Sequence, residues 1–259
     1  MVHVVGDAGG TFHLRDGLVI AVDSPGSPGV EALLLGSGRI GTQDWNAALA
    51  DSVERRSLHA ALVGRGALGA TEIQVLTSAV VQDGAFAVAV GGVERCVVGD
   101  AVDAPLLTAA DGVAPESLLS DTARRLDAVA SLPFPVSPLR DRVVPTGGVD
   151  LAGLTPDQRE IVVHATGRRT ARDIAFVVGR GLYAVTVAVS RMLGEELLEI
   201  APPETSFSPT RWDLTSLRPR TGPGRAAGRG DDRTGPLPTR RPGRSMWGPL
   251  RPSGADHSS

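Results

Sequence analysis

Arginine and hydroxyl side chains gather between residues 167 and 191, and this stretch offers the clearest chemistry in the sequence. Residues 167–181 read GRRTARDIAFVVGRG, and LYAVTVAVSRMLG follows directly. Guanidinium and hydroxyl groups bind phosphates and the edges of bases. The candidate DNA-contacting residues are Arg168, Arg169, Thr170, Arg172, Arg180, Tyr183, Thr186, Ser190 and Arg191.

Helices must hold these side chains, and the sequence predicts three helices followed by a strand. Thr155 and Thr170 each precede an amphipathic run and predict helix N-termini. A third helix is expected from Leu182, after a Gly-Arg-Gly break at 179–181. With a strand near 197–201, this is the order of a winged helix, in which the helix from Leu182 would enter the major groove.

Charge and polarity also favour a second interpretation. The expected reading helix begins Leu-Tyr-Ala-Val-Thr-Val-Ala-Val, which leaves few polar groups for bases. Residues 155–200 hold 6 arginines and 6 acidic residues, a less basic balance than DNA-reading domains usually have. In the alternative, the arginines are solvated or bind local carboxylates such as Asp173, and the helix from Leu182 is either buried all round or packed on a partner. An exposed apolar face along Val185, Val189 and Met192 would then bind a protein partner.

Composition divides the chain into an acidic body and a basic tail. Residues 1–200 carry 16 arginines against 24 acidic residues, whereas residues 201–259 carry 10 arginines against 5. An acidic body repels the phosphate backbone, which weighs against general nucleic-acid binding. Residues 206–259 are rich in Arg, Pro, Gly, Ser and Thr. We expect them to be disordered, because they cannot bury enough apolar surface to offset chain entropy.

The remaining sequence predicts the α+β fold class, with an antiparallel sheet and packed helices in residues 1–105. Alternating residues around Asp16-Gly17 predict a β-hairpin, and helices are expected from residue 29 to Gly36 or Gly38, over 41–56 and over 66–82. The run DGAFAVAVGGVERCVVGD at 83–100 predicts a second hairpin in the same sheet. Residues 106–205 are expected to hold an amphipathic helix, a Pro-rich linker and the winged-helix-like domain.

The sequence has no recognisable active site. Its five histidines and single cysteine show no metal-ligand spacing. GSGRIG at 36–41 lacks the Gly-Lys-Ser/Thr ending of a phosphate-binding loop. We therefore expect no catalytic residue, no metal, no cofactor and no enzymatic activity. Neither a signal peptide nor an apolar run of membrane length is found, so we expect a cytoplasmic protein without membrane contact.

Two segments resemble known bacterial modules. GGTFHLRDGLVIAVDSPGSPGVEALLLGSGRI at 9–40 resembles the strand, turn and helix of the PatA-type amino-terminal domain, a likeness that extends over about residues 9–100. TGRRTARDIAFVVGRGLYAVTVAVSRMLGEELLEI at 166–200 resembles winged helices of transcriptional regulators in high-GC bacteria. The resemblance implies a transcriptional regulator that binds DNA and whose N-terminal module senses or docks. The alternative is a non-enzymatic signalling adaptor whose winged helix binds a protein partner of a small-GTPase or roadblock-type system.

Overall fold

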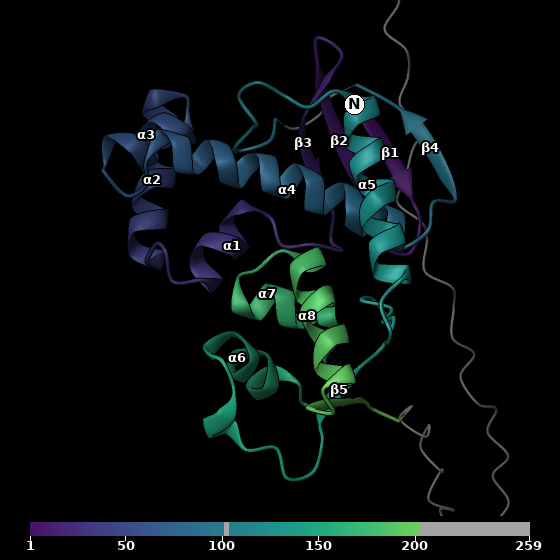
Figure 1. Cartoon of the computed structure of the whole chain (residues 1–259). Helices are drawn as coiled ribbons and strands as arrows, with labels where there is room; N and C mark the ends of the chain where they lie inside the picture. Colours follow the sequence, from purple (N-terminus) through teal and green to yellow (C-terminus); the bar gives the residue numbers. More distant parts are fainter. Residues whose placement is uncertain (101–103, 203–259) are drawn as a thin grey trace, which may run out of the picture. The chain divides into compact units, whose positions relative to one another are not determined.

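Four antiparallel strands form the main sheet of the structure, a computed structural model that describes residues 1–100 and 104–202. The strands are β1 (Val2–Val5), β2 (Gly10–Arg15), β3 (Leu18–Asp23) and β4 (Arg95–Val98), in the spatial order β3-β2-β1-β4 (Figure 1). Asp16 and Gly17 turn β2 into β3 with φ angles of 52° and 78°, which confirms the first predicted hairpin.

Four helices follow this hairpin: α1 (Val30–Gly36), α2 (Thr42–Arg55), α3 (Leu58–Gly64) and α4 (Ala70–Val90). Apolar side chains from all four form one buried cluster that includes Trp45, Leu62 and Ile73. The longest helix, α4, continues from this cluster to β3, where Val81 and Val22 share a second cluster. α4 therefore links the small helices to the sheet (Figure 1).

α4 is also where the structure departs from the sequence prediction. Residues 83–90 continue the helix instead of forming the first strand of a second hairpin, so that prediction is wrong. The physical reason is burial on every side, since residues 83–88 are all buried and the helical periodicity disappears. Gly84 is needed for this packing, because a Cβ atom there would lie 2.9 Å from Val22 Cγ1 in β3.

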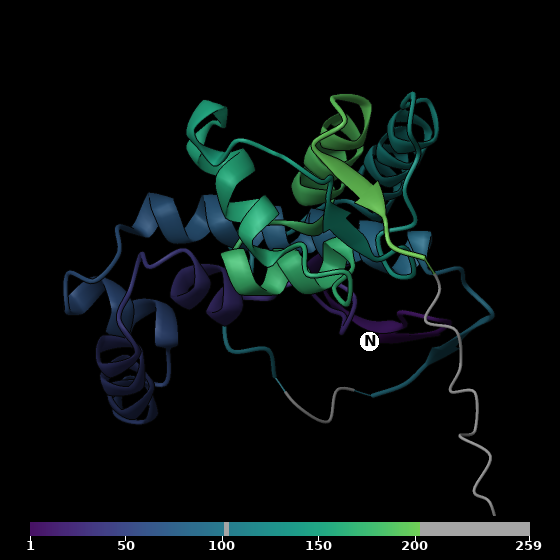
Figure 2. The ribbon, with the colours of Figure 1, turned by 90° about the horizontal axis from the view of Figure 1, so that it is seen from below.

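The C-terminal half contains α5 (Pro115–Ala130), β5 (Val143–Pro145), a 3-10 helix (Leu151–Gly153), α6 (Pro156–His164), α7 (Ala171–Val178), α8 (Leu182–Gly194) and β6 (Leu198–Ile200). Thr155 and Thr170 form capping boxes at α6 and α7, in agreement with the sequence. β5 lies in the segment expected to be a linker and pairs antiparallel with β6 (Figure 2). We call residues 143–200, from β5 to β6, the three-helix unit.

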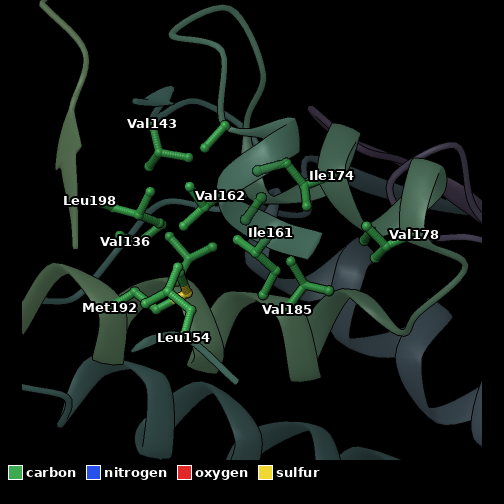
Figure 3. Packing of buried hydrophobic residues seen from close by; sticks show 14 residues of the cluster. Val136, Val143, Leu154, Ile161, Val162, Ile174, Val178, Val185, Met192 and Leu198 are labelled. Carbon is green, nitrogen blue, oxygen red and sulfur yellow. The ribbon is translucent and has the colours of Figure 1, made fainter. Parts of the chain in front are cut away.

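The three-helix unit has its own core (Figure 3). Val143 from β5, Ile161 from α6, Ile174 from α7 and Leu198 from β6 belong to it. The three-helix unit also packs on the N-terminal half. All described residues form one compact body, and the domain boundary that we expected near residue 105 lies inside it. Mixed helices and an antiparallel sheet confirm the α+β class. The tail expected to be disordered, residues 206–259, lies outside the described residues.

Candidate nucleic-acid interface

A carboxylate from α4 caps the N-terminal end of α8, the end that a DNA-reading helix must present to the major groove. Asp83 accepts hydrogen bonds from the backbone N–H of Leu182, at 2.5 Å to Oδ2, and of Tyr183, at 2.9 Å to Oδ1. α8 has no cap of its own, because glycine stands at the N-cap position, Gly181. Asp83 therefore serves as the cap from a position 99 residues before Leu182.

Asp83 is a buried carboxylate, with 6% of its surface exposed. Burial raises its pKa above the ordinary value of 3.8, because the charged form loses its hydration; the N–H groups of Tyr183 and Leu182 and the charge of Arg125 act in the opposite direction. Asp83 was not among the predicted site residues. Its isolation inside the apolar run VVQDGAFAVAV is the sequence signal that marks it.

Aromatic and cationic side chains surround this cap. The ring of Tyr183 meets Phe86 edge-on, with centroids 5.3 Å apart. The guanidinium of Arg125, from α5, lies 5.0 Å from the centroid of the Tyr183 ring. Leu182 is buried with Phe86 in one apolar cluster. We call Asp83, Phe86, Arg125, Leu182 and Tyr183 the α8 cap site; it places the first turn of α8 against α4 and α5.

Two of the three hydroxyl-bearing side chains of α8 that were predicted to touch DNA are buried, and the third, Tyr183, is half-buried. Thr186 exposes none of its surface and donates to the carbonyl oxygen of Leu182 at 2.7 Å. Ser190 donates to the carbonyl oxygen of Phe134 at 2.6 Å, which ties α8 to the segment that follows α5. Arg191, in contrast, is exposed. Among the predicted contacts in α8, Arg191 is thus the side chain that solvent reaches most freely.

Acidic side chains of α6 engage Arg180, in the corner between α7 and α8. Its Nη2 lies 2.6 Å from Asp157 Oδ1 and 3.1 Å from Glu160 Oε2. The hydrogen bond between Arg180 and Asp157 raises the pKa of the guanidinium and lowers that of the carboxyl, because each charged form stabilises the other. The corner where we expected a phosphate contact therefore carries an arginine whose positive charge is balanced by the carboxylates of Asp157 and Glu160.

The other predicted residues, at and before the start of α7, have separate roles. Arg172 Nε donates to the carbonyl oxygen of Pro25, in the N-terminal half, at 2.8 Å. Arg169 lies 3.1 Å from Nδ1 of His164. Thr170 is buried and caps α7. Arg168 is exposed.

The apolar side of α8 is enclosed as well. Val185, Val189 and Met192 are at most 1% exposed and belong to the core of the three-helix unit. Figure 3 shows Val185 and Met192 in this core. The exposed apolar face considered as a protein-binding surface is therefore not formed by these three residues. One side of α8 packs inside its own unit, and its first turn packs on α4 and α5.

Two glycines form a further contact between the halves. α1 ends at Gly36, and Gly179 follows α7 with a φ angle of 61°. A Cβ atom on Gly179 would lie 2.1 Å from the backbone nitrogen of Ser37, and one on Gly36 would lie 2.8 Å from Gly179 Cα. The backbones of α1 and of the α7–α8 corner can approach this closely because neither position carries a side chain.

Within residues 1–100 and 104–202, no group of three or more His, Cys, Asp or Glu side chains is placed to hold a metal ion. α4 has the length and hydropathy of a membrane-spanning helix. However, 61% of its apolar 18-residue segment is buried inside the protein, as in a core helix. Comparison with known proteins gives no assignment, because no family model, no curated protein and no solved structure matches the chain.

Proposed function

We propose that this chain is a non-enzymatic signalling adaptor that acts through a protein partner. The observation that carries the proposal is the Asp83 cap on α8. A helix that reads bases needs its first turn free to enter the major groove. Because the first turn of α8 lies against α4 and α5, we assign α8 the role of joining the two halves of the protein.

Electrostatics supports the same proposal. Residues 1–200 carry 16 arginines against 24 acidic residues, so the body repels a phosphate backbone at long range. Asp157 neutralises Arg180, and a backbone carbonyl group binds Arg172. The exposed candidates Arg168 and Arg191 are fewer than the phosphate contacts, roughly six to ten, that drive strong DNA binding.

The sequence resemblance supplies the partner class. Winged helices of the kind that residues 166–200 resemble accompany small-GTPase and roadblock-type partners in related architectures, so we infer a partner of this class. A DNA-binding transcriptional regulator is the second candidate function. It is favoured by the excess of arginine in residues 201–259, where 10 arginines face 5 acidic residues.

Titrations with the purified full-length chain separate the two candidates. Labelled roadblock-type protein, labelled small GTPase in its GDP and GTP forms, and labelled DNA duplexes of random and genomic sequence are each titrated, and fluorescence anisotropy is recorded at several salt concentrations. An adaptor binds one of the proteins saturably. Its DNA binding through the basic tail is independent of sequence and falls steeply with salt.

The matched variant is Arg168→Ala/Arg191→Ala, which removes the two exposed candidates of the three-helix unit. For an adaptor, DNA binding by this variant equals that of the wild type, because the tail carries it. Sequence-selective duplex binding that the variant loses would overturn the proposal in favour of the regulator. Failure of both protein classes to bind would overturn the assignment of the partner.

A further inference from the structure

β4 is an open edge of the four-stranded sheet. It pairs with β1 on one side, and no strand among the described residues pairs with its other side. All four of its residues are exposed, and Val97 and Val98 expose 45% and 82% of their surface. An exposed apolar edge strand is a template for pairing with a further strand.

The ladder with β1 shows which backbone groups of β4 face outward. Met1 and Gly99 exchange hydrogen bonds in both directions. Because bonding alternates along an antiparallel pair, the N–H and C=O groups of Val97 face β1, whereas those of Cys96 and Val98 face away from it. β4 therefore offers backbone donors and acceptors to a strand placed on its outer side.

β4 lacks two of the features that normally block such pairing, although it is only four residues long and contains a charged residue. Its register with β1 runs without a bulge, and it contains no proline. Arg95 is its one charged residue. An apolar groove of about 440 Å³ lies beside it, and Val2, Cys96 and Leu119 are among the lining residues. Apolar surface on the strand thus continues into apolar surface on the neighbouring elements.

We propose that a second copy of this chain pairs with β4 in antiparallel orientation, about a two-fold axis at Val97. Closed dimers use the same patch on both copies. In an antiparallel pair, side chains directly opposite one another lie on the same face of the sheet. A two-fold axis midway between two residues would place side chains of opposite faces across from one another, so the axis must lie at a residue. The four residues of β4 therefore offer four possible centres.

At three of these centres, a two-fold axis would place unfavourable pairs of side chains opposite one another. An axis at Arg95 places two guanidinium groups opposite one another, and like charges directly opposite are destabilising. An axis at Cys96 places Glu94 opposite Val98. An axis at Val98 places Asp100 opposite Cys96 and shortens the paired segment.

The axis at Val97 places apolar residues opposite one another. Val97 faces its own copy, at a pair without mutual hydrogen bonds, where side chains are closest, and Cys96 faces Val98 on both sides of the axis. Glu94 and Asp100 then face one another just beyond the strand ends. This register therefore has one unfavourable feature, the repulsion between Glu94 and Asp100 at each end, which salt weakens by screening the charges.

Disulfide trapping tests the pairing, because Cys96 is the only cysteine of the chain. Val97→Cys in a Cys96→Ser background should form a covalent dimer under mild oxidation at micromolar concentration. Val53→Cys in the same background is the matched control, since Val53 is 79% exposed on α2 and away from β4. Equal cross-linking of both variants, or none at position 97, would overturn the proposed register.

Sedimentation equilibrium of the full-length chain tests the dimer without oxidation. Val97→Arg places like charges opposite one another and should raise the dimer dissociation constant by about tenfold or more. Glu94→Lys should lower that constant, because each lysine then faces Asp100 of the second copy. Circular dichroism confirms that both variants fold. A wild-type chain that stays monomeric at tens of micromolar, or a dimer unaffected by either variant, would overturn the proposal.

Discussion

Replacing Asp83 with alanine tests whether the α8 cap site holds the two halves of the protein together. The substitution removes the two hydrogen bonds that Leu182 and Tyr183 donate. A hydrogen bond to a charged group contributes about 1.5–3 kcal/mol, and loss of an N-cap costs about 1 kcal/mol. Removal of a desolvated carboxylate offsets part of this loss. We expect the free energy of unfolding to fall by about 3 kcal/mol.

Urea unfolding of the full-length chain, followed by circular dichroism, measures this change. Hydrogen exchange at the amides of Leu182 and Tyr183 reports on the cap directly, because both N–H groups lose their acceptor. Glu72→Ala is the matched control, since Glu72 lies on the same helix and forms a partly exposed ion pair with Arg39. A loss below about 1 kcal/mol at Asp83, together with unchanged amide exchange, would refute the reasoning.

Three further substitutions test other parts of the structure. A pKa of Asp83 that is raised in the folded state stabilises the fold below the unfolded value of 3.8, and this stabilisation is lost as pH rises through the folded-state pKa. In urea unfolding, the stability deficit of Asp83→Asn relative to wild type should therefore shrink as pH rises from about 3.8 through the folded-state pKa. Gly179→Ala should lower stability by more than about 2 kcal/mol in thermal melts, whereas Gly38→Ala, also at positive φ but in open space, should cost about 1 kcal/mol. Arg180→Ala should lower the urea midpoint slightly at low salt and not at high salt, because its partner Asp157 is solvent-exposed.

Helix starts in the three-helix unit could be predicted because their signals are local. Thr155 and Gln158 cap each other reciprocally at α6, and Thr170 and Asp173 do so at α7. Each pair spans three positions, so the sequence alone contains both partners. The first hairpin was predictable for the same reason, since its two turn residues adopt positive φ angles that Asp and Gly tolerate.

Contacts of the candidate site could not be predicted in this way, because they join residues far apart in the chain. Asp83 and Leu182 are 99 positions apart, and Arg172 and Pro25 are 147 positions apart. One sequence gives the periodicity of each helix but not the surface on which its faces pack. Thr186 therefore resembled a polar side chain available to bases, although the structure buries it completely.

The α8 cap site also determines what DNA binding through α8 would require. If opening this contact costs about 3 kcal/mol, fewer than about 1% of molecules present the first turn of α8 at any time. Apparent DNA affinity through α8 would then be reduced by roughly a hundredfold, since each 1.4 kcal/mol is about a factor of ten. Asp83→Ala lowers that barrier by the contribution of its two hydrogen bonds, so a rise in sequence-selective DNA affinity toward this size would identify α8 as a masked reading helix. Lost stability with unchanged DNA affinity would instead identify α8 as a structural helix, as the adaptor requires.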